Sequence, residues 1–160
     1  MAGQIVERAR GAKNLALVGI RRGGVPLAAK LAEHIEELEQ IAVPVGAVDI
    51  ALYRDDASTA LPKPQIGRSD IPFEVEGRRI VLVDDVLYTG RTVRAAVDAL
   101  LDYGRPQKIE LAVLVDRGGR ELPIQPDFVV RTTEVDVNAR IDVLFDAPGI
   151  RAVVYPGATS

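Results

Sequence analysis

Two adjacent carboxylates, Asp84 and Asp85, are the residues of this chain with the clearest chemical meaning. They follow the apolar, mostly β-branched run 80–83, which predicts a buried strand with the two acids at its carboxyl end. A short turn around Gly90 comes next, and a helical pattern begins directly after it. Paired carboxylates can bind vicinal hydroxyls or Mg²⁺, and the amides of a turn that leads into a helix can bind a phosphate. The run therefore predicts a site for a phosphorylated sugar and a metal ion.

A simpler interpretation of the same run is an ordinary strand-to-helix loop in which Asp84 and Asp85 only cap the helix. An isolated pair of acids after a strand does not separate these two interpretations. The turn residues favour the ligand site, because Gly90 permits a close backbone approach and Thr89 and Thr92 add hydroxyl groups.

The elements that must position this site alternate between apolar strands and amphipathic helices. Strand patterns cover residues 15–20, 43–52, 79–83 and 109–115, helical spacing covers 26–38 and 92–103, and three short β candidates cover 128–131, 134–137 and 141–145. This alternation predicts an α/β fold with a mainly parallel central sheet flanked by helices. Ligands of such sheets bind beyond the carboxyl ends of the strands, where the loops 21–24 and 84–92 and the segment after Asp116 are expected.

Composition limits the class of protein. The 160 residues are enough for one domain with a full core, and the formal net charge of −3 gives no overall attraction to nucleic acid. The absence of cysteine excludes disulfides and thiolate-bound metal, and the single histidine, His34, excludes histidine-rich metal sites. No apolar run approaches the roughly 20 residues of a membrane helix, and residues 1–10 lack the apolar segment of a signal peptide. We therefore expect a cytoplasmic protein that does not enter a membrane.

The segment 84–92 resembles the phosphoribosyl diphosphate (PRPP) signature of type I phosphoribosyltransferases. The resemblance implies that Asp84 and Asp85 bind the ribose hydroxyls and help to place Mg²⁺, directly or through its water shell. It also implies a set of nucleotide-binding residues, of which residues 88–92 surround the 5′-phosphate. The set is Asp84, Asp85, Val86, Leu87, Tyr88, Thr89, Gly90, Arg91 and Thr92.

Other stretches narrow this likeness to one family. Residues 18–20, 49–56, 104–106, 111–118 and 120–124, together with the signature, are similar to the PyrR family. Members of that family are uracil phosphoribosyltransferases that also bind pyrimidine-operon mRNA. The likeness covers about residues 4–129. It implies a type I phosphoribosyltransferase fold in a single domain, 1–160, with a small hood at about 116–131, a flexible loop, and assembly at least as a homodimer.

The implied reaction converts uracil and PRPP to UMP and pyrophosphate, with Mg²⁺ as cofactor. The resemblance makes Asp84, Asp85 and Arg54 the catalytic residues, with Arg54 reaching pyrophosphate from a loop at 54–70 that closes over the substrates. In the hood, Arg117 and Val129 are the candidates for contact with the base. A structural ion pair is the alternative role for Arg117.

Residues 21–24 resemble the pyrophosphate-binding loop, which adds Arg21, Arg22 and Gly23 to the expected site. A solvated basic turn is the alternative interpretation. The family usually has Thr-Arg-Gly here, whereas this chain has Arg22, Gly23 and Gly24, so the usual arginine position holds Gly23. The change puts pyrophosphate affinity and turnover in question.

The basic surface that binds RNA in the family is also altered. Arg8, Arg10, Arg120 and Arg131 are the arginines that could still contribute to it. The match to the N-terminal helix is short, and Gly119 and Gln125 stand where the family has histidine and arginine. RNA affinity depends on the number of cations that neutralise phosphates, so we expect weakened or differently targeted RNA binding.

Two functional hypotheses follow from the sequence. The first is a uracil phosphoribosyltransferase of pyrimidine salvage that also regulates transcription of pyrimidine genes by UMP-responsive attenuation. The second is an RNA-binding regulator that uses the PRPP pocket as a nucleotide sensor with little turnover. A different base, such as hypoxanthine, guanine or orotate, is disfavoured by the likeness of the hood.

Overall fold

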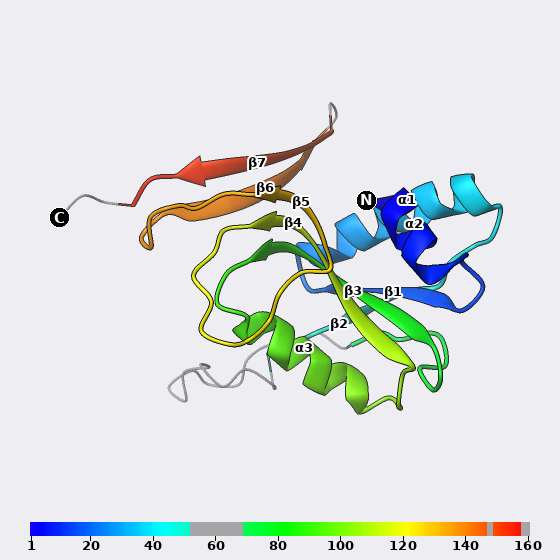
Figure 1. The fold of residues 1–160 in the computed structure, drawn as a ribbon. Helices are drawn as coiled ribbons and strands as arrows, with labels where there is room; N and C mark the ends of the chain where they lie inside the picture. Colours follow the sequence, from blue (N-terminus) through cyan, green and yellow to red (C-terminus); the bar gives the residue numbers. More distant parts are fainter. Residues whose placement is uncertain (52–68, 147–148, 158–160) are drawn as a thin grey trace.

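A five-stranded sheet, in which every pair of neighbours is parallel, forms the centre of the fold (Figure 1). The computed structural model describes residues 1–51, 69–146 and 149–157. The strand order is β2-β1-β3-β4-β5. These strands are β1 (Leu15–Ile20), β2 (Val45–Val48), β3 (Arg79–Leu87), β4 (Lys108–Asp116) and β5 (Phe128–Thr132). The predicted α/β fold with a mainly parallel sheet is confirmed.

Helices cover both faces of this sheet. Helices α1 (Ala2–Ala9) and α2 (Gly24–Glu39) lie on one face, and α3 (Arg91–Leu101) lies on the other (Figure 1). On β1, Leu15 and Leu17 pack with the first pair of helices, whereas Ala16 and Val18 pack with α3. Successive side chains of a strand point to opposite faces, so a strand covered on both sides must be apolar throughout. The continuous apolar runs in the sequence have this origin. No helix of the described ranges has both the length and the apolar character to cross a membrane.

The acidic pair lies within a strand rather than after one. β3 continues past the predicted end at 83 to Leu87, and Asp84 and Val86 are still in register with β4. The second strand is shorter than the predicted range 43–52. Of the predicted loop 54–70 only its end is described, where Asp70 forms an antiparallel bridge with Ala47.

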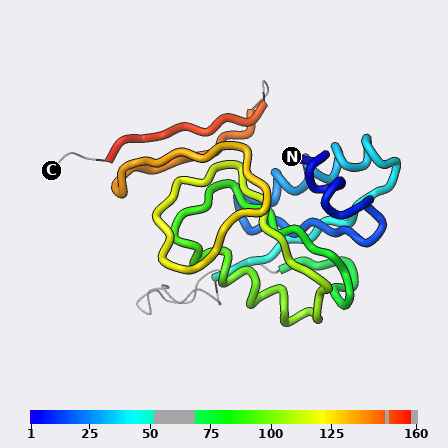
Figure 2. The backbone as a smooth tube through the Cα atoms, in the orientation of Figure 1, coloured from blue at the N-terminus to red at the C-terminus, as the bar shows by residue number. Residues whose placement is uncertain are grey.

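A separate antiparallel hairpin, β6 (Arg140–Asp146) and β7 (Gly149–Tyr155), follows β5. The tube in Figure 2 shows that it projects from the body of the fold. The expected strand at 141–145 is confirmed, but β7 was not predicted, although Ile150, Ala152 and Val154 alternate along it. The strand predicted at 134–137 is wrong: this segment leads into a turn whose carbonyls accept side-chain hydrogen bonds from Arg117.

Candidate functional site

The carboxyl edge of the sheet brings together three segments that are far apart in sequence. The turn after β1, the end of β3 and the hood segment after β4 lie side by side because these strands are parallel neighbours. Two contacts join them: the Arg117 amide donates to the Leu87 carbonyl over 3.1 Å, and Gly23 packs against the Asp85 carboxylate. One site is thus assembled from the three loops expected at this edge.

Asp84 and Asp85 form an acidic pair at the centre of the edge. Asp84 is buried, with 6% of its surface exposed, and its Oδ1 accepts the Asp85 amide at 2.8 Å. The half-buried Asp85 accepts the Val86 amide at 2.8 Å. Burial is the main cause that raises the pKa of Asp84 well above its usual value; the charge of Asp85 and the hydrogen bond between the two side chains add to it. A cation bound at the pair would stabilise its ionised form.

The donor set of this pair fits Mg²⁺. That ion prefers oxygen ligands and usually combines one or two carboxylates with waters and substrate phosphates. Across residues 1–51, 69–146 and 149–157, no three His, Cys, Asp or Glu side chains are grouped to hold a metal. A cation at Asp84 and Asp85 would therefore complete its coordination with water and ligand oxygens, as Mg²⁺ favours.

A cavity of about 290 Å³ lies directly after the acidic pair, at the turn between β3 and α3. Gly90 adopts a φ of +94°, which an L-residue rarely adopts, and the helix begins at the next residue. The backbone amide of Arg91 donates to Thr89 Oγ1 at 3.2 Å. The side chain of Arg91 donates from Nε to the Glu121 carboxylate of the hood at 2.8 Å. The residues that line the cavity are Asp84, Val86, Leu87, Tyr88, Thr89, Gly90, Thr92 and Val93. Its lining thus contains seven of the nine residues expected to bind the nucleotide.

The turn after β1 packs its backbone on the end of β3. A Cβ atom at Gly23 would overlap the Asp85 carboxylate, and one at Gly24 would overlap the Val83 carbonyl. The peptide bond between Arg21 and Arg22 is cis, and both residues are exposed. The glycine at the family's arginine position therefore has a packing role here, and two exposed arginines precede it in the same turn.

Arg117 of the hood is buried, and both of its terminal guanidinium nitrogens donate to protein groups. Its guanidinium carbon lies 4.1 Å from the centre of the Tyr88 ring. Its Nη1 donates to the Ala139 carbonyl at 2.9 Å and its Nη2 to the Asp136 carbonyl at 3.0 Å. The expected structural alternative was an ion pair, but the partners are backbone carbonyls and an aromatic ring. Arg117 thus joins the turn after β3 to the base of the β6–β7 hairpin.

Arg120, expected on the RNA surface, lies inside the hood. Its side chain is 15% exposed and forms an ion pair with Asp116 at 2.7 Å. It also donates to the carbonyls of Tyr88, at 3.0 Å, and Ile124, at 2.7 Å. Burial alone would raise the pKa of Asp116, but the hydrogen bonds from Arg120 and from the Gly118 amide outweigh it and lower that pKa. These partners leave Arg120 poorly placed to bind RNA.

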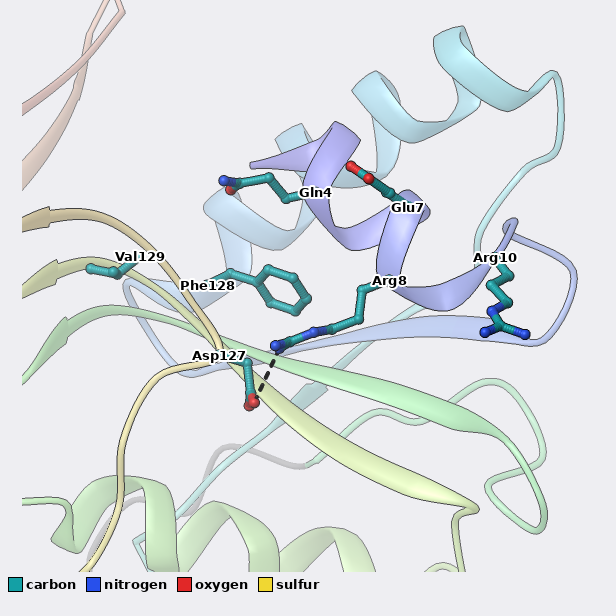
Figure 3. A pocket seen from close by; sticks show the side chains of 7 residues that line it. All are labelled: Gln4, Glu7, Arg8, Arg10, Asp127, Phe128 and Val129. Atoms are coloured by element: carbon teal, nitrogen blue, oxygen red, sulfur yellow. Dashed lines mark hydrogen bonds and ion pairs between the residues drawn. The ribbon is translucent and has the colours of Figure 1, made fainter.

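A groove of about 640 Å³ between α1 and the start of β5 contains two other expected RNA contacts, Arg8 and Arg10 (Figure 3). Arg8 points toward Asp127, with 3.4 Å between Nη1 and Oδ1, and lies 5.2 Å from the centre of the Phe128 ring. Its Nη1 is also 3.5 Å from Oε2 of the buried Glu110. The groove is lined by Gln4, Glu7, Arg8, Arg10, Asp127, Phe128 and Val129. Two arginines and two acids balance in this lining, so it is not a basic patch.

The remaining expected residues have simpler placements. Val129 is half-buried in β5, in register with Val113, and lines the same groove. Arg131 is exposed on β5. Arg54 and the expected closing loop around it lie outside the described residues, apart from the end of that loop at 69–70.

Contacts between the hood and the turn after β3 were not anticipated from the sequence. The Thr89 carbonyl accepts the amides of Glu121 and Leu122, and a Cβ atom at Gly119 would lie 2.6 Å from the Tyr88 ring. The only signal in the sequence is that segments 84–94 and 111–124 both match one family. No local pattern shows that they touch.

Comparison with known proteins agrees with this geometry. The model of the phosphoribosyl transferase domain family matches residues 1–145. The chain is 56% identical over 147 residues to the bifunctional protein PyrR of Geobacter sulfurreducens, a match that covers 92% of this chain and 83% of the relative. It is 58% identical over 129 residues to the bifunctional protein PyrR of Deinococcus deserti, covering 81% of this chain and 70% of that relative.

Solved structures support the fold. Hypoxanthine phosphoribosyltransferase from Trypanosoma cruzi, as a K68R mutant in a ternary substrates complex, superposes with a TM-score of 0.67. The match covers 88% of this chain and 75% of that chain at 22% identity. A purine phosphoribosyltransferase from Pyrococcus horikoshii matches with a TM-score of 0.60 and 24% identity, covering 83% of this chain and 77% of that chain. At these identities the likeness establishes the shared fold and not the substrate.

Replacing Asp84 by Asn is expected to stabilise the free chain and to impair use of PRPP. Because the pKa of Asp84 is raised in the folded state, ionisation of this group destabilises the fold. The penalty grows as the pH rises from the ordinary pKa of the carboxyl group to its raised pKa, and it is complete above the raised pKa. An asparagine side chain at this position would be neutral at every pH and could donate to Asp85. Without metal near neutral pH, we expect a gain of about 1 kcal/mol, or about 2–4 °C in melting temperature.

Melting curves of both proteins from acid to neutral pH test this expectation. The difference in melting temperature should grow as the pH rises and shrink when Mg²⁺ is added. Asp85→Asn, at the less buried member of the pair, is the matched control and should give a smaller gain. A difference that does not change with pH would contradict the destabilising role assigned to the Asp84 charge.

Replacing Gly23 by Ala is expected to displace the Asp85 carboxylate, because the new Cβ would occupy its place. Displacement of the Asp85 carboxylate from its place in the site is expected to lower kcat/KM for PRPP by about 10- to 100-fold, with little change in melting temperature. Gly3→Ala is the matched control, because nothing lies within 4 Å of a Cβ there. Equal kinetic constants for the Gly23→Ala variant and the wild type would show that the packing of Gly23 on Asp85 has no functional role.

Proposed function

The chain belongs to the phosphoribosyl transferase domain family and, within it, to the PyrR proteins, and we propose that it converts uracil and PRPP to UMP and pyrophosphate. The observation that carries this proposal is the acidic pair, with Asp84 buried, beside the cavity at the turn after β3, with the turn after β1 packed on Asp85. We further propose a single domain over residues 1–160, at least a homodimer, and a cytoplasmic location.

In this reaction a uracil nitrogen displaces pyrophosphate at the anomeric carbon, and positive charge develops on the sugar. Asp84 and Asp85 lie where their oxygens can bind the ribose hydroxyls and favour that charge. Mg²⁺ held at the same pair would neutralise the leaving pyrophosphate when bound. The cavity beside the pair accepts the 5′-phosphate at residues 88–92, close to the start of α3.

Arg21 and Arg22 are proposed to bind pyrophosphate, because both are exposed in the turn that contacts the acidic pair. Arg54 remains the proposed contact from the closing loop. Val129 and the backbone of the hood are proposed to border the base; Arg117 is assigned to holding the hood, since its Nη1 and Nη2 donate to backbone carbonyls. The protein thereby works by orientation and by placement of charge, without covalent catalysis.

We also propose that the chain binds pyrimidine-operon mRNA and that UMP strengthens this binding. Arg10 and Arg131 are exposed, whereas Arg120 is internal and Arg8 is paired with acids. The available cations are therefore fewer than the sequence indicated. A regulator with little turnover is the second candidate, and the glycine at position 23 is the observation that favours it.

Purified protein supplied with PRPP, Mg²⁺ and a panel of bases is expected to form a nucleotide only from uracil. Removal of Mg²⁺ with EDTA should abolish UMP formation, and added Mg²⁺ should restore it, because a divalent cation is needed to neutralise pyrophosphate. Product formation from hypoxanthine, guanine or orotate would contradict the assigned base. No turnover together with UMP binding would support the second candidate.

A filter-binding titration with the chain's own pyrimidine-operon leader tests the regulatory proposal. We expect tighter binding to the leader than to an unrelated hairpin, and a further gain when UMP is present. Arg131→Ala should weaken binding and flatten its salt dependence, because each phosphate contact contributes to that slope. Lys30→Ala, on an exposed part of α2, is the matched control. Equal affinity for leader and unrelated hairpin would remove the regulatory assignment.

A further inference from the structure

Residues 117–127 of the hood hold the turn after β3 by donating hydrogen bonds to the carbonyl groups of the turn. Arg120 Nη1 donates to the Tyr88 carbonyl at 3.0 Å. The Glu121 and Leu122 amides donate to the Thr89 carbonyl at 2.9 and 3.2 Å. Both central carbonyls of the turn therefore face the hood.

This arrangement determines where the amides of the turn point. Among the described residues only the bond between Arg21 and Arg22 is cis, so the peptides after Tyr88 and Thr89 are trans. In a trans peptide the C=O and the following N–H point in opposite directions. The Thr89 and Gly90 amides therefore point away from the hood, on the side where both residues line the 290 Å³ cavity. Within the described ranges, neither amide donates to a backbone acceptor.

Arg120 is itself rigidly held. Its Nε donates to the Ile124 carbonyl at 2.7 Å, and its Nη2 contacts Asp116 at 2.7 Å, with 15% of the side chain exposed. A planar guanidinium can bind three acceptors in fixed directions, which an ammonium group on a flexible stem cannot do. A charged donor on the Tyr88 carbonyl also polarises that peptide and strengthens its N–H as a donor.

We propose that Arg120 is a positioning residue for the phosphate-binding turn: it fixes the Tyr88–Thr89 peptide so that its N–H points at the 5′-phosphate. This role rests on the proposed function, because the phosphate belongs to PRPP or UMP. Arg120 acts through the turn and does not touch the phosphate. The Tyr88 ring is fixed on its other side by Arg117, so the hood holds this residue by both its backbone and its side chain.

Calorimetric titration of the full chain with UMP and, separately, with pyrophosphate tests the proposal in Arg120→Gln. We expect UMP affinity to fall about tenfold, as for one lost hydrogen bond to a charged group, with pyrophosphate affinity unchanged. KM for PRPP should rise by a similar factor, while KM for uracil stays constant. Gln125→Ala is the matched control, because it removes only the exposed contact of Arg120, at 3.1 Å, and should leave both affinities unchanged.

A purely structural role for Arg120 would lower the active fraction or the melting temperature without a selective loss of UMP affinity, and that result would overturn the proposal. If Arg120→Gln does not fold, Arg120→Lys is the variant that tests the proposal. A lysine keeps the positive charge beside Asp116 but cannot also reach the carbonyls of Tyr88 and Ile124. If the Arg120→Lys variant binds UMP as tightly as the wild type, the proposal is overturned. Wild-type protein that binds UMP but forms none would contradict only the proposed turnover. Wild-type protein that does not bind UMP would overturn both.

Discussion

Burial of the Asp84 carboxyl group is the constraint on which the rest of the site depends. A central strand of a parallel sheet is covered on both faces, so a carboxylate near its end loses much of its hydration. The neighbouring Asp85 adds a second negative charge, and the raised pKa of Asp84 records the combined cost. Such a pair is best stabilised when a cation or hydroxyl donors arrive. The free chain thus holds a local destabilisation that a bound cation would relieve.

Close backbone packing around this pair follows from the same need. Gly23 and Gly24 bring the turn after β1 onto the end of β3, and neither position has room for a side chain without movement of its neighbour. On the other side, the hood engages the turn after β3 through Arg117, Arg120 and backbone amides. The acidic pair therefore lies between two backbone segments, each of them positioned by contacts distant in sequence.

The central sheet was largely predictable because its inner strands β1, β3 and β4 each contain an uninterrupted apolar run. Such runs cover residues 15–20, 80–83 and 111–115, and all three strands are present. β7 was missed because its alternating residues form a hairpin that is largely exposed and has only a weak apolar signal. Arg120 was assigned to the RNA surface because the family resemblance implies a basic surface that includes the hood. Its partners, Tyr88 and Asp116, come from two other segments, and no local pattern reveals such contacts.

Nucleotide sensing and turnover would use different parts of the proposed site. UMP carries a ribose and a 5′-phosphate but no pyrophosphate, so in the proposed site it would contact the acidic pair and the turn after β3, with its base bordered by the hood. Those parts follow the family pattern and are braced by the hood. In the proposed site, turnover would additionally need the turn after β1. In that turn Gly23 lacks a guanidinium group but lets the backbone contact Asp85, and the exposed Arg21 and Arg22 are the cations. The departure at Gly23 therefore bears on turnover, for which the exposed Arg21 and Arg22 would have to replace the missing arginine of the loop.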